Sequence, residues 1–472
     1  MNVPFGLQWI MLLAAALAGC ASIDEPPTPG TDVPVATQWH APLSHEGSLD
    51  SLTRWWSQFR DPLMLSLIEH GQDASATLAQ AMSRIADAQA ARVGGKAALL
   101  PSLDATVDAS RGRAEVGDPV GKMSSAGLRV SWELDLFGAN RAASSAAQAG
   151  VEASLAGWHD ARVSIAAEIA TTYVDLRACE AQVVQAELDA QSRNETSRLT
   201  DLMASNGFQS PAEAYLAGAS AAEGQVTLAE RRARCEYLIK SLVALTARNE
   251  AELRHELAAA NAYLPQPVQF SIDSVPAQVL IQRPDIYAAA RDVVVASAES
   301  AQAQALRWPR VTLSGNISRS RISEGGVSTN GTLWNIGPVA VTLPLFDGGD
   351  RRANAEAARV RYDVATVIYA DRLREAIREV ETALVSLDST AARSDDARRA
   401  VDGFERAYRA VAARYQVGSA SLFDLEDARR SMVASQVTLI ELQREHVASW
   451  IELYRAVGGG WSAQALEEVA GT

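Results

Sequence analysis

The residues of this chain best suited to covalent chemistry are its three cysteines, Cys20, Cys179 and Cys235. Cys179 and Cys235 each lie 28 positions from Gly207, so a helical hairpin that turns at this glycine would bring the two thiols opposite each other. In an oxidising compartment such a pair can form a disulfide that closes a long loop. Two independent buried cysteines are the alternative, because a bridge also needs the right rotation of the facing residues.

Cys20 follows an apolar leader, GLQWIMLLAAALAGC, that is short for a transmembrane helix and ends in small residues. This pattern is typical of a secretory signal, and LAGC resembles a bacterial lipobox, in which the thiol of the cysteine carries lipid. We expect a signal peptide over residues 1–19, a palmitate-type lipid on Cys20, and a proline-rich tether over residues 20–50. A plain cleaved signal or a buried helix is the alternative. In this resemblance the residues after the cysteine sort the lipoprotein, and Ala21-Ser22 lacks the aspartate that would hold it at the inner membrane. The resemblance therefore implies an outer-membrane location.

Motifs typical of catalysis and metal binding are absent from the sequence. Its six histidines are scattered, and it has no HExxH motif, P-loop or nucleophile elbow. The formal charge of -14 argues against a nucleic-acid partner. We therefore expect neither an enzyme nor a metal site, and no cofactor beyond the lipid on Cys20.

Two carboxylates at a spacing of three, Asp424 and Asp427, lie in the segment LFDLEDARRS. On a helix this spacing places both side chains on one face. Asp424 and Asp427 either act together as a functional pair of carboxylates or are ordinary acids at a helix start, where the helix dipole favours negative charge.

An internal duplication organises the elements that must position these residues. The segment QVTLAE at 225–230 returns as QVTLIE at 436–441, and Gly207 and Glu213 correspond to Gly418 and Asp424. We expect a first repeat over residues 51–265, a second over residues 266–460 and a short tail over residues 461–472.

Each repeat contains one predicted β-hairpin, over residues 101–136 and 309–345, in which apolar and polar residues alternate. Alternation over about 10 residues is typical of a membrane strand with one face toward lipid and the other toward a wet lumen. Residues 111–124 and 319–331 are the expected loops. The tryptophans at the strand ends could form an interfacial girdle or lie at the rim of a soluble sheet; they are Trp132, Trp308 and Trp334. The polar residues expected to face the lumen are Arg129, Glu133 and Asp135.

Long helical hairpins are predicted after the strands, over residues 139–250 and 350–457. These segments lack proline except near the first tip and are rich in Ala, Glu, Arg and Gln, which favours helix. A helix over residues 140–204 would be about 100 Å long, so we expect a rod with a returning partner helix. Shorter helices over residues 63–99 and 285–306 precede the two β-hairpins.

The strand count limits the assembly. Four strands do not close a barrel, and an open sheet edge in lipid leaves backbone groups unsatisfied. Two copies would give eight strands and three would give twelve, and a conduit favours three because a twelve-stranded barrel leaves an open lumen.

Taken together, the chain resembles the TolC-like outer membrane factors, and among them the lipid-anchored OprM- or NodT-type efflux lipoproteins. The resemblance covers nearly the whole chain after the leader. It rests on WWSQFRDPLMLSLI (55–68), LLPSLDA (99–105), SWELDLFG (131–138), RPDI (283–286), LPLFDGG (343–349) and YQVGSASLFDLEDA (415–428). It implies an α+β membrane protein: a homotrimer with a twelve-stranded outer-membrane β-barrel and a long periplasmic α-helical barrel of coiled-coil hairpins. The implied partners are a periplasmic adaptor and an inner-membrane pump of the RND type.

The same resemblance assigns roles to residues near the helical tips. Asp424 and Asp427 match acids of the family's periplasmic constriction, while Glu213 keeps one acid in the first repeat and Leu216 replaces the other. The residues that match adaptor-docking tips are Asn206, Gly207, Phe208, Val417, Gly418 and Ser419. The alternative for both glycines is that they serve only the turn.

The expected function is a passive conduit of a tripartite efflux system that exports drugs or other small molecules across the outer membrane of a Gram-negative bacterium. Type I protein secretion and metal efflux remain open as alternatives. A lipid-anchored periplasmic scaffold is the alternative from a different class, and the alternating strands argue against it because a scaffold needs no membrane hairpins.

Overall fold

The structure is a computed structural model that describes Trp39, Ala41 and residues 55–113, 116, 119–259, 262–267, 280 and 283–461. The predicted signal peptide, Cys20, nearly all of the tether and residues 462–472 of the tail lie outside the described residues.

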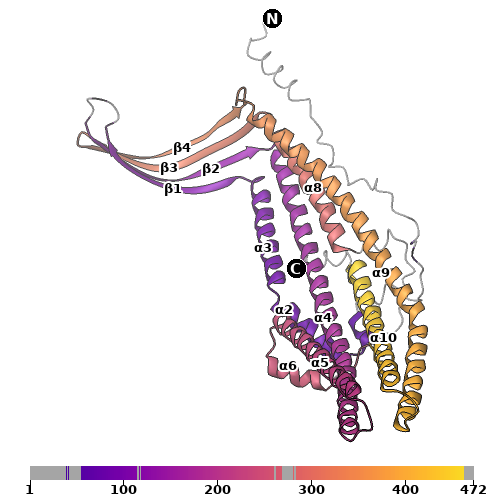
Figure 1. Cartoon of the computed structure of the whole chain (residues 1–472). Helices are drawn as coiled ribbons and strands as arrows, with labels where there is room; N and C mark the ends of the chain where they lie inside the picture. Colours follow the sequence, from indigo (N-terminus) through magenta and orange to yellow (C-terminus); the bar gives the residue numbers. More distant parts are fainter. Residues whose placement is uncertain are drawn as a thin grey trace. The chain divides into compact units, whose positions relative to one another are not determined.

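Eight α-helices and four strands have bounds within the described residues, and residues 55–59 form a 3₁₀-helix (Figure 1). In chain order they are α2 (Pro62–Ala74), α3 (Ala76–Ala97), β1 (Ser102–Gly112), β2 (Gly121–Leu134), α4 (Ala139–Ser205), α5 (Pro211–Thr246), α6 (Glu250–Ala258), α8 (Pro284–Ala305), β3 (Arg310–Glu324), β4 (Val327–Thr342), α9 (Asp350–Gln416) and α10 (Leu422–Ala456). The predicted helix over residues 63–99 is interrupted at Ser75, whose extended backbone separates α2 from α3. The short helix α6 follows Asn249, which caps it, and was not predicted.

One compact unit contains the sheet and comprises residues 83–155 and 288–371. The strands pair antiparallel in the order β1-β2-β3-β4, which leaves β1 and β4 at the edges. Leu103 pairs with Val130, and Leu128 pairs with Ile317, so the apolar residues of neighbouring strands share one face. The opposite face carries polar residues, including Asp104 paired with Arg129. The alternation in the sequence therefore becomes a two-faced sheet.

The second β-hairpin is longer than expected. Residues 319–331 were predicted as a loop, but β3 continues to Glu324 and β4 begins at Val327. The connection is the pair Gly325-Gly326, with φ of 56° and 85°. Two residues with positive φ form the tight turn that matches the twist of antiparallel strands, so the polar residues on either side continue the ladder.

The residues at the base of the sheet also differ from prediction. Asp135 was expected on β2 beside Arg129 and Glu133, but β2 ends at Leu134. The Asp135 carboxylate instead accepts from the backbone N–H groups of Asn140 and Arg141 at 3.2 and 2.9 Å, where α4 begins. An acid that caps a helix N-terminus satisfies donors that have no partner inside the helix.

The three tryptophans predicted at strand ends do not form one ring. Trp132 is near the base of β2 and donates through Nε1 to Leu99 O at 3.0 Å. Trp308 precedes β3 and stacks on Phe137 with ring centroids 5.7 Å apart. Trp334 is paired with Ile317 in the middle of β4, so it is not at a strand end.

The second compact unit is helical and comprises residues 33–82, 156–287 and 372–472, of which the structure describes the parts named above. Its core is built from apolar residues of α2, α4, α5, α9 and α10, among them Leu67, Tyr173, Leu242, Val380 and Ile451. None of the helices in the described part of the chain is both long and apolar enough to cross a membrane.

Candidate functional site

The two helical hairpins of the second unit turn in the same way. Gly207 and Gly418 have φ of +81° and +72°, a conformation that costs glycine little. Phe208 N donates to Met203 O at 2.9 Å and Gly207 N donates to Ala204 O at 3.0 Å. The second tip repeats this pattern: Ser419 N donates to Arg414 O at 2.9 Å and Gly418 N donates to Tyr415 O at 3.0 Å. Both α4 and α9 therefore end in a Schellman motif.

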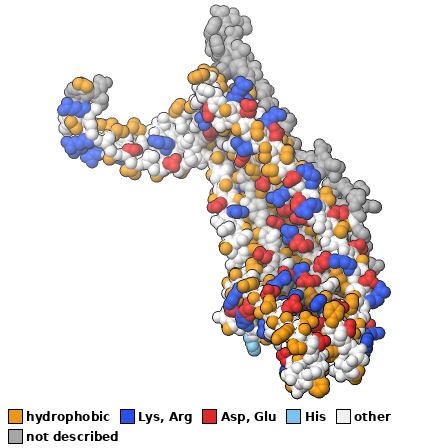
Figure 2. Space-filling model, in the orientation of Figure 1, with side chains coloured by type: hydrophobic (Ala, Val, Ile, Leu, Met, Phe, Trp, Pro, Cys, Tyr) orange, Lys and Arg blue, Asp and Glu red, His pale blue; other side chains and the backbone are white. Residues whose placement is uncertain are grey.

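All six residues predicted at the tips are exposed. The largest of them are apolar: Phe208 is 79% exposed and Val417 is 78% exposed. Hydrophobic side chains gather at these helical ends (Figure 2). Exposed apolar side chains at the end of a rod are suited to contact with another protein.

The returning helices begin with matching capping boxes. Ser210 caps α5, and Glu213 Oε2 accepts from Ser210 N at 3.2 Å and from Ser210 Oγ at 3.1 Å. Ser421 caps α10, and Asp424 Oδ2 accepts from Ser421 N at 2.9 Å and from Ser421 Oγ at 2.7 Å. The helix-start role that was the alternative for Asp424 is thus present in the structure, and Glu213 has the same role in the first hairpin.

Asp424 and Asp427 nevertheless share an exposed face of α10, whereas Leu422 and Leu425 are buried on the other face. Hydrogen bonds from Ser421 lower the pKa of the Asp424 carboxyl. The Asp424 and Asp427 carboxylates therefore lie on the exposed face of α10, and the hydrogen bonds of the cap hold Asp424 in its charged form. In the first hairpin Glu213 is half-buried and Leu216 is exposed, so the equivalent face of α5 carries less charge.

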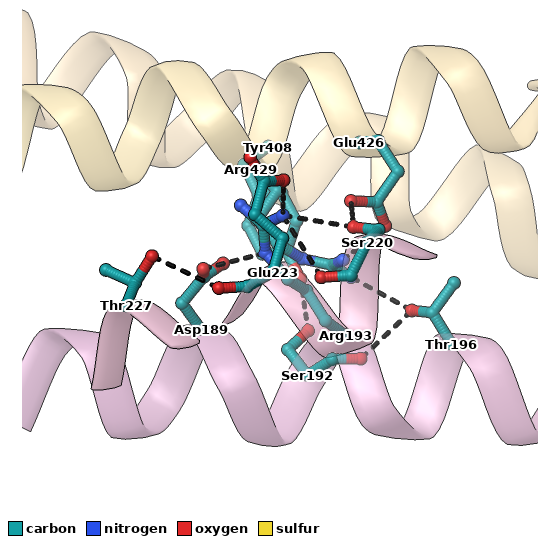
Figure 3. A network of polar contacts seen from close by, with 10 residues as sticks. All are labelled: Asp189, Ser192, Arg193, Thr196, Ser220, Glu223, Thr227, Tyr408, Glu426 and Arg429. Carbon is teal, nitrogen blue, oxygen red and sulfur yellow. Dashed lines mark hydrogen bonds and ion pairs between the residues drawn. The ribbon is translucent and has the colours of Figure 1, made fainter. Parts of the chain in front are cut away.

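A network of polar side chains joins the two hairpins near these tips (Figure 3). Arg429 on α10 is only 2% exposed and forms an ion pair with Glu426 on the same helix. Its Nη2 also donates to Thr196 Oγ1 on α4 at 3.0 Å. The Arg429 guanidinium lies over the ring of Tyr408 on α9, with Arg429 Cζ 5.9 Å from the ring centroid. The Tyr408 hydroxyl is 3.3 Å from Ser192 Oγ on α4.

Ser220 on α5 completes the network. Its Oγ donates to Glu426 Oε2 at 2.9 Å and accepts from Arg193 Nη1 at 3.0 Å. Arg193 Nε donates in turn to Asp189 Oδ2 at 2.8 Å. Burial raises the pKa of the Asp189 carboxyl, and the Arg193 charge opposes this shift. Charged and polar groups of all four helices are therefore linked in a partly dry environment, where such contacts are stronger than in water.

The sequence contained a signal for this network that the prediction missed. Leu422, Leu425, Glu426 and Arg429 follow the spacing i, i+3, i+4, i+7, which marks one helix face. Since the two leucines face the core, Glu426 and Arg429 had to be buried with them, while the flanking acids had to be exposed. The partners on α4 follow the same spacing at Asp189, Ser192, Arg193 and Thr196, but all four are polar, so the sequence alone does not mark their face as buried.

Further from the tips, Cys179 on α4 and Cys235 on α5 are joined by a disulfide, with the sulfur atoms 2.06 Å and the Cα atoms 5.7 Å apart. Both cysteines are buried, at 3% and 8% exposure. The positions equidistant from Gly207 do face each other across the hairpin.

Of the predicted lumen residues, Arg129 and Glu133 lie on the polar face of β2, paired with Asn316 and Thr312 of β3.

Comparison with known proteins agrees with this architecture. The pattern that defines the family "Outer membrane efflux protein" matches residues 67–247 and 275–459. The chain belongs to the outer membrane efflux protein family.

Relatives in this family match over nearly the full chain. Nodulation protein T of Rhizobium leguminosarum bv. trifolii is 30% identical over 434 residues, which cover 88% of this chain and 89% of the relative. The solvent efflux pump outer membrane protein SrpC of Pseudomonas putida is 25% identical over 468 residues, covering 96% and 98%. The structure of the outer-membrane channel OprN superposes with a TM-score of 0.78 at 25% identity, covering 92% of this chain and 96% of that one. The fold of this outer membrane efflux protein is that of the TolC-like outer membrane channels, with four antiparallel strands among its described residues.

Proposed function

We propose that this outer membrane efflux protein is the outer-membrane channel of a tripartite efflux system. Three copies share a twelve-stranded β-barrel, which continues into a periplasmic tunnel of helical hairpins. The channel is passive, and its cargo of drugs or other small molecules is supplied by an inner-membrane pump of the RND type through a periplasmic adaptor. Cys20 carries a lipid that adds a second attachment to the outer membrane.

The two-faced sheet with open edges is the observation that supports this proposal. β1 and β4 each present an unpaired edge in the single chain, and one face of the sheet is apolar and exposed. In lipid an unpaired edge costs several kcal/mol for each unsatisfied backbone group. Pairing β4 of one copy with β1 of the next removes every edge, and three copies give a barrel wide enough for a lumen.

The tips and the acids have separate roles in this proposal. The exposed tips that include Phe208 and Val417 bind the adaptor through their apolar side chains. Asp424 and Asp427 form two carboxylate rings under threefold symmetry, which narrow the tunnel and disfavour anions. The capping role of Asp424 is compatible with this ring, because its hydrogen bonds hold the carboxylate charged on the exposed face.

The mass of the detergent-extracted protein, measured by light scattering with the detergent subtracted, tests the assembly. Three protomers are expected. A stable monomer would contradict a shared barrel and would favour a lipid-anchored scaffold, while two protomers would give eight strands and no open lumen.

A further inference from the structure

The apolar face of the sheet becomes strongly basic at its far end. The charged residues on this face are Arg111 on β1, Lys122 on β2, and Arg319 and Arg321 on β3. All four are exposed and lie toward the hairpin turns. We call these four residues the basic band. Figure 2 shows the Lys and Arg side chains gathered at this end of the sheet.

The register places the basic band on the same face as the apolar residues. Arg111 pairs with Lys122, and they continue the rows that contain Leu103 and Val130. Arg319 pairs with Ala126 and Arg321 with Ser124, in the row that contains Ile317. Since side chains alternate along a strand, residues an even number of positions apart point the same way. The described strand residues of this face include no acid, whereas the opposite face carries acids such as Asp104 and Glu133.

Among the residues that the structure describes, the basic band has no acidic partner that would neutralise it. Arg321 Nε donates to Ser328 Oγ at 3.2 Å, and the structure records no ion pair for any of the four cations among the described residues. Arg111 and Lys122 stand directly opposite each other, and like charges at such positions destabilise a sheet. An anion bound between them would remove this repulsion.

The position of the basic band along the membrane normal follows from its distance to Trp132, which lies near the end of β2 that leads into α4. Ten positions separate Trp132 from Lys122 on β2. At about 3.4 Å per residue and a strand tilt of about 40°, they are roughly 26 Å apart along the membrane normal. The apolar band of outer-membrane barrels is about 25 Å tall. With Trp132 at one boundary, Arg111 and Lys122 therefore lie at the headgroups of the other boundary. Arg319 and Arg321 pair with Ala126 and Ser124, so their backbones lie roughly 10 and 5 Å deeper. Long arginine side chains at such depths extend toward the headgroups.

We propose that the basic band binds the phosphate groups of a phosphorylated glycolipid in the outer leaflet. This inference rests on the proposed function, because it needs the apolar face to contact lipid. Charge complementarity favours a polyanionic headgroup, since four cations gathered on an exposed face match several phosphates. Continuity with the apolar face favours a lipid over a free anion, because acyl chains then lie against Leu128, Val107 and Ile317 while the headgroup reaches the cations.

The test measures binding of lipid A to the full-length protein in phosphatidylcholine nanodiscs. Diphosphorylated lipid A is compared with the same lipid after dephosphorylation, in 50 mM and 500 mM NaCl. Each cation near an anionic headgroup contributes about fivefold in affinity, so we expect at least a tenfold preference for the diphosphorylated form at low salt. The preference should shrink at high salt because exposed charges are screened.

The variant Arg111→Gln, Lys122→Gln, Arg319→Gln, Arg321→Gln should lose this preference. The matched control replaces the same number of cations on α9, with Arg398→Gln, Arg399→Gln, Arg406→Gln, Arg409→Gln, which are exposed and form ion pairs within their own helix. The control should bind like the wild type. If the fourfold variant does not insert, the double variants Arg111→Gln with Lys122→Gln and Arg319→Gln with Arg321→Gln are each expected to lose part of the preference.

The outcomes separate this inference from the proposed function. A wild type that inserts as a trimer but binds both lipids equally would overturn the inference alone. So would an equal loss in the α9 control, which would show an effect of net charge, or displacement of lipid A by 10 mM inorganic phosphate, which would show a small-anion site. A wild type that neither inserts nor forms a trimer would overturn the proposed function and this inference together.

Discussion

Thr390 and His446 are hydrogen bonded across the second helical hairpin, with Thr390 Oγ1 and His446 Nδ1 2.9 Å apart. Each lies 211 positions after a member of the disulfide-bonded pair Cys179 and Cys235. The two hairpins are therefore linked at equivalent positions by different chemistry, covalent in the first and polar in the second. His446 Nε2 also accepts from Trp450 Nε1 at 3.1 Å, so the imidazole is held neutral with its proton on Nδ1.

The disulfide should make a measurable contribution to the stability of the first hairpin. The bridge spans 56 positions, and a loop of this length corresponds to about 4 kcal/mol in the chain-entropy description. The variant Cys179→Ala with Cys235→Ala should melt at a lower temperature than the oxidised wild type and at about the temperature of the reduced wild type. In exported protein the two thiols should react with an alkylating reagent only after reduction, and thiols that react beforehand would contradict a bridge in the cell.

The His446 contact should make stability depend on pH. Burial lowers the pKa of His446 below its ordinary value of 6.5. In the unfolded chain the ring binds a proton at a higher pH than in the folded chain. The free energy of unfolding should therefore fall as the pH decreases through 6.5 toward the folded pKa.

In the variant His446→Gln the free energy of unfolding should fall less as the pH decreases, as measured by thermal melting between pH 7.5 and pH 5. Thr390→Val is the matched control, because it removes the hydrogen-bond partner and keeps the buried, titrating ring. Identical pH dependence in the wild type and His446→Gln would show that this histidine is not responsible.

The ion pair of Arg429 and Glu426 should be needed for the contact between the hairpins. In Arg429→Met the Glu426 side chain, which is 10% exposed, would keep a buried charge without its cation. Removing one partner of a buried pair costs about 3–5 kcal/mol, whereas replacing both by apolar residues is often neutral. Hydrogen exchange of residues 189–199 and 405–430 should therefore accelerate a hundredfold or more in Arg429→Met, and much less in Arg429→Met with Glu426→Leu.

The exposed neighbour Arg430 provides the control on the same helix. Arg430→Met should leave the exchange rates unchanged. Equal acceleration in the single and double variants would indicate that Arg429 acts through packing against Tyr408 rather than through its charge.

Much of the fold could be predicted because it follows from local patterns. The absence of proline over long stretches gave α4 within a residue of its observed ends and the start of α9 at Asp350, and alternation gave the two β-hairpins. The duplication gave the equivalence of the two tips, which end in the same hydrogen-bond pattern at Gly207 and Gly418.

The features that were mispredicted depend on chain geometry that composition does not report. Polar residues at 319–331 resemble a loop, but the Gly325-Gly326 turn allows them to pair as strands. Asp135 continues the alternation of β2 in the sequence, yet its carboxylate accepts hydrogen bonds from the backbone N–H groups of Asn140 and Arg141 at the start of α4. Thr196 and Ser220 lie more than 200 positions from the residues that they contact, and only the packed structure brings them to the Arg429–Glu426 pair.

Asp424 and Asp427 should control ion flow through the proposed tunnel. Alanine is a poor probe at Asp424, because it would remove the capping box with Ser421 as well as the charge. The variant Asp424→Asn with Asp427→Asn keeps the shape and an acceptor oxygen. We expect this variant to have a higher conductance in planar bilayers and a weaker preference for cations, measured as a reversal potential across a KCl gradient.

The equivalent change in the first hairpin is the control. Glu213→Gln alters the matching capping box of α5, where Leu216 replaces the second acid, so its effect should be smaller. The Ser421 hydrogen bonds lower the pKa of Asp424 below its ordinary value of 3.8, so its carboxylate remains charged at pH 5. The cation preference of the wild type should accordingly persist at pH 5. An unchanged conductance and reversal potential in the Asn variant would mean that these acids serve the helix start alone and that the constriction lies elsewhere.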